Sequence, residues 1–236
     1  MEPDSAGRPE AVSIQAGAVS LQGVLRLPAA ASAVVLFAHG SGSSRLSPRN
    51  TFVAERLREA GLATLLLDLL TEDEEQYDAD TGALRFDIPL LTVRLVAATE
   101  WTLRQPRLQR LAVAYFGAST GAAAALAAAA QTPRVTAVVS RGGRPDLAGP
   151  ALSRVRAATL LIVGGDDTQV LSLNRKALRQ LRCEAQLAVV PGATHLFVEP
   201  GTLEQVAALA ADWFARYARL PALPASPTAA DRALRQ

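Results

Sequence analysis

A short glycine-rich segment around a serine is the strongest chemical signal in the sequence. Gly117-Ala118-Ser119-Thr120-Gly121 lies between an apolar run that predicts a strand and an alanine-rich run that predicts a helix. In that context, Gly-x-Ser-x-Gly forms a sharp turn that lifts the Ser hydroxyl above the sheet edge, at the positive end of the helix. Both glycines leave room for the turn. We therefore predict that Ser119 is a nucleophile; the alternative is a Gly/Ser turn without chemistry.

A Ser hydroxyl needs a general base, and the chain contains only two histidines, His39 and His195. His195 follows the last predicted strand, in a loop that spans residues 191–197. An imidazole titrates near neutrality and can take and return the Ser proton. His39 belongs to a different motif, directly after another strand, where its position favours support of the loop. We predict His195 as the base; the alternative is a structural or exposed loop histidine.

The base in turn needs a carboxylate that fixes its tautomer and stabilises the imidazolium. Asp166 and Asp167 follow a predicted strand in the loop Gly164-Gly165-Asp166-Asp167-Thr168-Gln169-Val170. One of the two is predicted to be the third member of the site. The other is then a helix cap or a turn residue.

An acyl-transfer site also needs donors for the oxyanion. The backbone N–H of Thr120, directly after the nucleophile, is the first candidate. A second donor is expected from the loop His39-Gly40-Ser41-Gly42, which follows the first buried strand. We predict the N–H of Ser41 for this role, with that of Gly42 as the next choice.

Alternating strands and helices must position these residues. Two alternating runs at 11–15 and 19–27 predict a hairpin, and the continuous apolar runs that follow are typical of strands buried on both faces. The predicted strands are 33–38, 63–67, 111–116, 135–140, 159–163 and 185–190, and the predicted helices are 48–60, 87–104, 120–131, 150–157, 170–181 and 202–218. This pattern predicts a mostly parallel α/β sheet covered on both faces. The candidate residues then meet where the strands end, which is where such sheets bind ligands.

Composition excludes several other classes. Half of the residues are hydrophobic and the net charge is +2, which is unlike a disordered chain. The arginines are scattered, so neither a nucleic-acid nor a membrane-binding surface is indicated. A single cysteine, Cys183, excludes an internal disulfide and a Cys-based metal cage. The acidic N-terminus lacks an apolar signal region, and the apolar run Ala122–Ala130 is too short to span a bilayer. We expect a cytoplasmic protein, monomeric or homodimeric, with no metal or organic cofactor.

The motifs HGSG, GASTG, GGDDTQV and GATHLF, in this order, resemble an α/β-hydrolase of the dienelactone hydrolase-like family. The resemblance covers about residues 11–218 and implies an eight-stranded, mostly parallel sheet that starts with an antiparallel pair. In this family the acid stands in Gly-x-x-Asp-x-x-Val, so the resemblance assigns that role to Asp167. Dienelactone hydrolases use a Cys nucleophile where this chain has Ser119, so a general ester is expected as substrate. Similar bacterial hydrolase domains are sometimes joined to phosphoribosyltransferases, and no such partner domain is expected here.

Six acidic residues crowd the segment Glu72–Asp80, between a strand and a helix. We expect a solvated loop; the alternative is a mobile flap that disfavours anionic substrates. The gap between elements is too short for a large cap domain. Residues 1–218 are predicted to form one catalytic domain, and residues 219–236 a Pro/Ala-rich tail.

Together these features predict a serine hydrolase that cleaves a small carboxylic ester through a Ser119–His195–Asp167 triad and an acyl-enzyme. Two alternatives remain at this stage. The same triad could cleave a thioester or a peptide, or the fold could be a catalytically silent binding module.

Overall fold

Eight strands form one sheet in the computed structural model, which describes residues 7–40 and 42–220. The strand order is β1-β2-β4-β3-β5-β6-β7-β8. β2 pairs antiparallel with β1 and β4, and every other neighbour is parallel. The strands are β1 (Glu10–Ala16), β2 (Val19–Arg26), β3 (Ala33–Ala38), β4 (Ala63–Leu67), β5 (Ala112–Ala118), β6 (Val135–Arg141), β7 (Ala158–Gly164) and β8 (Ala185–Val190). The predicted mixed sheet with an antiparallel start, the α/β-hydrolase fold, is confirmed.

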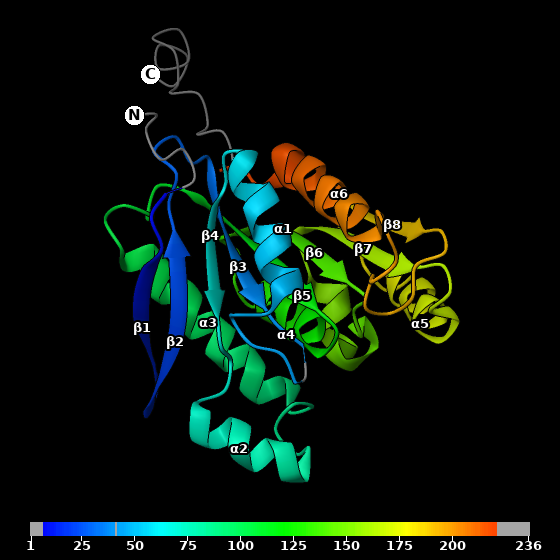
Figure 1. The fold of residues 1–236 in the computed structure, drawn as a ribbon, viewed down its shortest axis with the longest axis horizontal. Helices are drawn as coiled ribbons and strands as arrows, with labels where there is room; N and C mark the ends of the chain where they lie inside the picture. The colour runs from blue at the N-terminus through cyan, green and yellow to red at the C-terminus, as the bar shows by residue number, and fades with distance from the viewer. Residues whose placement is uncertain (1–6, 41, 221–236) are drawn as a thin grey trace, which may run out of the picture.

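Helices cover both faces of the sheet (Figure 1). α1 (Pro48–Glu59) and α6 (Thr202–Tyr217) pack together on one face. The other face carries α3 (Ile88–Arg104), α4 (Thr120–Ala129), α5 (Thr168–Leu178) and the 3-10 helix η1 (Pro145–Arg154). The short helix predicted at 150–157 is thus earlier in the chain, with a kink at Gly149 (φ 51°) before Pro150.

Two apolar layers, one on each side of the sheet, make up the core. Every residue of β3, β4, β5 and β7 is buried, as their continuous apolar sequences predict. Phe37 and Phe116 stack at 4.9 Å between centroids on the face of α1 and α6. On the other face, α4 is buried along its whole length, because its alanine side chains let the helix lie close to the sheet. The buried sheet is therefore a rigid base for the loops at its carboxyl edge.

The segment after β4 differs from the prediction. Residues 72–81 form a helix, α2 (Glu72–Thr81), beyond the carboxyl ends of the central strands (Figure 1). A capping box explains it: the Thr71 hydroxyl accepts from the Glu74 N–H, and the Glu74 carboxylate accepts from the Thr71 N–H. Gly82 ends the helix in the left-handed conformation (φ 65°). The expected solvated loop was wrong, because acidic residues in a first turn favour the start of a helix and the cap at Thr71 completes it.

A single helix between β4 and α3 confirms the expected absence of a large cap domain in this part of the described chain. The predicted tail, 219–236, lies outside the described residues from position 221 onward. No helix within the described ranges is long and apolar enough to cross a membrane.

Candidate active site

Ser119 sits at the turn from β5 into α4, with φ 50° and ψ −122°. It is one of two described non-glycine residues with positive φ, a conformation that costs energy for a residue with a Cβ. Backbone hydrogen bonds hold the turn: the Ser119 N–H donates to the Arg141 carbonyl at 3.2 Å, and the Arg144 N–H donates to the Ser119 carbonyl at 3.0 Å. The backbone of Ser119 is thus held at the carboxyl edge of the sheet.

The two flanking glycines are required by contact, as the sequence motif predicts. A Cβ on Gly117 would lie 2.5 Å from the Ala122 Cα, and a Cβ on Gly121 would lie 2.2 Å from the Ala38 carbonyl oxygen. Either distance is far below van der Waals contact. The turn therefore packs directly against the end of β3, which carries the second candidate loop.

Asp167 and His195 meet across the loops that follow β7 and β8. The distance between His195 Nδ1 and Asp167 Oδ2 is 2.6 Å. The Asp167 side chain is 13% exposed and that of His195 is 40% exposed, so the imidazole reaches solvent while the carboxylate is covered. Asp167 stands at the N-cap position of α5 but makes no side-chain cap there. Its carboxylate binds the histidine instead of the helix.

Asp166, the other candidate, is exposed, and its backbone N–H donates to the Ala193 carbonyl at 3.0 Å. This bond ties the β7 loop to the β8 loop. Gly164 allows the two loops to approach this closely, since a Cβ there would lie 2.2 Å from the Ala193 oxygen. Thr194, next to His195, donates its hydroxyl to Glu199 at 2.5 Å. Apart from the family pattern, the sequence did not distinguish Asp166 from Asp167 as the partner of the histidine. In the structure Asp167 makes that contact.

Ser119 and His195 border the same backbone segment. The Arg141 carbonyl accepts the Ser119 N–H, while a Cβ on Gly142 would lie 3.6 Å from His195 Cε1. No hydrogen bond joins the Ser119 hydroxyl to His195 among the described residues. Such bonds are often long before substrate binds. The three residues thus converge at the carboxyl ends of β5, β7 and β8.

The loop after β3 lies against Ser119. A Cβ on Gly40 would be 2.8 Å from the Ser119 Cβ, so only glycine allows this approach. Gly42 has a φ of 64° and, with Thr120, lines the cavity described below. Ser41, the first choice for an oxyanion donor, lies outside the described residues.

His39 is buried and bound by backbone groups on both ring nitrogens. Nε2 accepts from the Leu69 N–H at 3.3 Å, which leaves the proton on Nδ1 to donate to the Gly40 carbonyl at 3.0 Å. Burial lowers the pKa of His39, so the ring is neutral at pH 7. These contacts suit the predicted structural role, since they connect the β3 loop to the end of β4.

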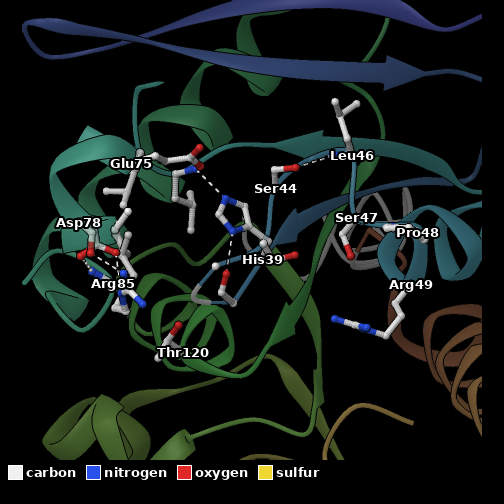
Figure 2. Close-up of a pocket in the computed structure, with 17 residues that line it drawn as sticks. His39, Ser44, Leu46, Ser47, Pro48, Arg49, Glu75, Asp78, Arg85 and Thr120 are labelled. Atoms are coloured by element: carbon white, nitrogen blue, oxygen red, sulfur yellow. Dashed lines mark hydrogen bonds and ion pairs between the residues drawn. The ribbon is translucent and has the colours of Figure 1, made fainter. Parts of the chain in front are cut away.

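A cavity of about 500 Å³ opens between α1 and α2 (Figure 2), and Ser119, Asp167 and His195 are not among the residues that line it. Gly40 and Thr120, which flank the nucleophile, form part of its wall. α2 supplies Glu75 and Asp78, and the start of α1 supplies Arg49 on the opposite side. The sequence prediction missed this contribution of α2, although the Thr71-x-x-Glu74 pattern was a signal for a helix at that place.

One group in the described chain has the composition of a metal site: His39, Asp68 and Glu75, with ligand atoms within 4.8 Å of one another. Two of its three ligand groups are already engaged. His39 Nε2 accepts from a backbone N–H, and Asp68 accepts from the backbone and side chain of Arg45. Burial and the charge of Asp68 raise the pKa of Glu75. His39 and Asp68 thus join the β3 loop to the end of β4 by hydrogen bonds, whereas none is found for the Glu75 side chain among the described residues.

Comparisons with known proteins identify the family and the fold. The model of the family described as "Dienelactone hydrolase family" matches residues 21–220. The crystal structure of a dienelactone hydrolase from Anabaena variabilis is 58% identical, with a TM-score of 0.88 over 90% of this chain and 99% of that one. A Xanthomonas campestris structure described as an a/b serine hydrolase without lid has a TM-score of 0.72 at 21% identity, over 92% and 97% of the two chains, and shares the fold.

Two curated proteins from Mycobacterium tuberculosis, strains CDC 1551 / Oshkosh and ATCC 25618 / H37Rv, are each 59% identical over 209 residues. Both carry the name "Putative phosphoribosyl transferase". The match covers 88% of this chain and 46% of each relative. The chain thus spans about half the length of these curated relatives.

Proposed function

Because this chain belongs to the dienelactone hydrolase family, a family of hydrolases, we propose that it is a serine hydrolase that cleaves a small carboxylic ester through an acyl-enzyme. Ser119 is the nucleophile, His195 the general base and Asp167 the acid that orients it. The 2.6 Å contact between His195 Nδ1 and Asp167 Oδ2, next to a Ser in a strained strand-to-helix turn, carries the proposal.

The first half-reaction forms the acyl-enzyme. His195 Nε2 takes the Ser119 proton as Oγ bonds to the carbonyl carbon, and the carbonyl oxygen becomes an oxyanion. The N–H groups of Thr120 and of Ser41 or Gly42 are the proposed donors to that oxyanion, each worth about 3–4 kcal/mol. When the intermediate collapses, the ester C–O bond breaks and the imidazolium returns its proton to the leaving alkoxide.

The second half-reaction reverses these roles with water. His195 takes a proton from water as the hydroxide adds to the acyl carbon, and the acid leaves as the proton returns to Ser119 Oγ. Asp167 accepts the Nδ1–H throughout, which keeps Nε2 free to act as base. The exposed His195 edge suits this step, because water must reach it.

The phosphoribosyl transferase name of the mycobacterial relatives belongs to chains about twice this length, and the site proposed here performs a different chemistry. Ser119 follows a strand in a Gly-x-Ser-x-Gly turn, an arrangement that serves acyl transfer.

Replacement of Ser119 by Ala tests the proposal. Removal of the nucleophile from a triad lowers kcat by about 10⁶-fold. We expect S119A to lose hydrolysis of short p-nitrophenyl esters and labelling by a fluorophosphonate probe, with an unchanged circular dichroism spectrum. Labelling of S119A at the wild-type level would contradict the assignment. A folded wild-type protein that is never labelled would indicate a silent binding module instead.

A further inference from the structure

Two arginines lie together beside the candidate active site without a role in the proposed triad. Arg141 is the last residue of β6 and is 8% exposed. Its Nη2 donates to the Asn50 side-chain oxygen at 3.3 Å, which places the guanidinium against the first turn of α1. Arg49, the neighbour of Asn50, extends from α1 at the wall of the cavity (Figure 2).

Neither guanidinium has a carboxylate partner among the described residues. Nε and Nη1 of Arg141 and Nε of Arg49 are buried there without a hydrogen-bond partner. Burial, together with the charge of Arg49, lowers the pKa of Arg141 to about 10, so the group remains protonated at pH 7. By contrast, the buried Arg94 has its counter-charge in Glu74 at 2.6 Å.

The start of α1 adds to this positive region. Its first turn contains no acidic residue, and the N-cap Ser47 makes no side-chain hydrogen bond to the helix. The positive end of the helix dipole therefore adds to the two guanidinium charges. α2, on the opposite wall of the same cavity, begins with four acidic residues instead. An unpaired buried cation is costly, and a pair of them beside a helix N-terminus fits an anion that binds there.

The two arginines are connected to the surroundings of the nucleophile. The Arg141 carbonyl accepts the Ser119 N–H, and Arg49 shares its cavity with Gly40 and Thr120. A ligand that fills this cavity from Arg49 to Thr120 extends toward the residue that follows Ser119. Arg49 is half-buried, so a shift of its side chain gives an anion access to the covered N–H groups of Arg141.

We propose that Arg49, Arg141 and the first turn of α1 bind a phosphate group, and that this group is carried by the ester that the enzyme hydrolyses. A phosphate dianion matches two guanidiniums and a helix N-terminus, whereas a carboxylate would balance only one of the arginines. The first half of the proposal is independent of catalysis. The second half rests on the proposed esterase function.

The first experiment measures binding without catalysis. Inorganic phosphate is titrated into the full chain, at constant ionic strength, while thermal unfolding and heat of binding are followed. We expect a saturable rise in Tm in wild type and in S119A, and a loss of affinity of about ten- to a hundredfold in R49Q and in R141M. R156Q is the matched control, because Arg156 is exposed and precedes β7 at the opposite edge of the sheet.

The results separate the two halves. No phosphate-dependent rise in wild type overturns the site, as does an equal loss in R156Q. A rise with acetate but none with phosphate also overturns it in favour of a carboxylate. If R141M does not fold, R49Q decides the outcome, because that side chain is partly exposed. Phosphate binding by S119A without any esterase activity in wild type would leave the site standing while the proposed function failed.

The second experiment asks where the phosphate comes from. The kcat/KM for acetoxyphenyl phosphate is compared with that for phenyl acetate, which lacks the anion. We expect a higher kcat/KM for the phosphate-bearing ester in wild type, a fall of that ratio in R49Q, and competitive inhibition by inorganic phosphate. Equal kcat/KM values for the two esters in a protein that binds phosphate would refute the substrate half and assign the site to free phosphate.

Discussion

Replacement of Asp167 by Asn tests the orientation of the base most directly. The Asp167 carboxylate lies 2.6 Å from His195 Nδ1 and is mostly covered. The Asn amide is nearly the same size, so the packing of the loop is retained. Its NH₂ group, however, donates to Nδ1 instead of accepting from it. The His195 proton then moves to Nε2, the atom that must accept the proton of Ser119.

The size of the effect follows from this tautomer change. At the acid of a Ser-His-Asp triad, an Asp-to-Asn change lowers kcat by about 10⁴-fold. This equals a loss of about 5.5 kcal/mol of transition-state stabilisation. We expect KM to change little, because Asp167 is absent from the cavity wall that would hold the substrate.

The assay is ester hydrolysis under saturating substrate, with D166N as the matched control. Asp166 is the adjacent residue, is exposed, and joins the other loop through its backbone N–H only. We expect D166N to keep its kcat within about twofold, the range typical of a surface change. An equal loss of kcat in the two variants, or full activity in D167N, would refute the reasoning that the 2.6 Å contact sets the tautomer.

Three further changes test other parts of the structure. In G121A the new Cβ would lie 2.2 Å from the Ala38 oxygen, so we expect a loss of about 1–3 kcal/mol in urea unfolding together with a large fall in esterase activity. E74Q removes the counter-charge of the buried Arg94, which costs about 3–5 kcal/mol, and we expect faster amide hydrogen exchange in α2. The Arg94 hydrogen bond lowers the pKa of Glu74. The stability that this ion pair gives to wild type is therefore complete above the ordinary pKa of 4.5 and is lost as the pH falls through the lowered pKa. Amide exchange of E74Q should show no such step at acid pH. Burial raises the pKa of Tyr115 to about 12, so an absorbance titration should show one tyrosine that ionises last. Y115F should remove that step and lower the free energy of unfolding by about 1 kcal/mol, because the hydrogen bond to Thr99 at 2.6 Å is lost.

Local sequence was sufficient for most of the sheet. The runs at Ala33–Ala38 and Ala63–Leu67 are continuous apolar segments, and they form β3 and β4 with the predicted bounds. Short continuous apolar runs between turn signals are typical of strands buried on both faces, so local sequence is enough to place them, although their pairing partners are distant in the chain. α2 escaped prediction because its apolar content is too low to produce an amphipathic stripe. Its helix depends on a cap at Thr71 and on the pairing of Glu74 with Arg94, which lies 20 residues further along the chain.

The candidate triad divides in the same way. The Gly-x-Ser-x-Gly turn at Ser119 is a local motif, since both glycines are needed for contacts with the chain around them. The choice between Asp166 and Asp167 needed the family pattern, because adjacent acids on one loop have the same composition and spacing. In the structure the Asp167 carboxylate contacts His195, whereas no side-chain hydrogen bond or ion pair of Asp166 is found among the described residues.

The sequence alone determined the class of fold, the nucleophile motif and the limit of two histidines, because each depends on residues close together in the chain or on simple counts. Only the tertiary structure decided which charged groups lie together beside the candidate site. Arg49 and Arg141 are separated by β4, β5 and three helices, and nothing in either local sequence marks them as neighbours. Their proximity is set by the crossover of strands in the sheet, and the electrostatics of a buried site depend on distance in space rather than on separation along the chain.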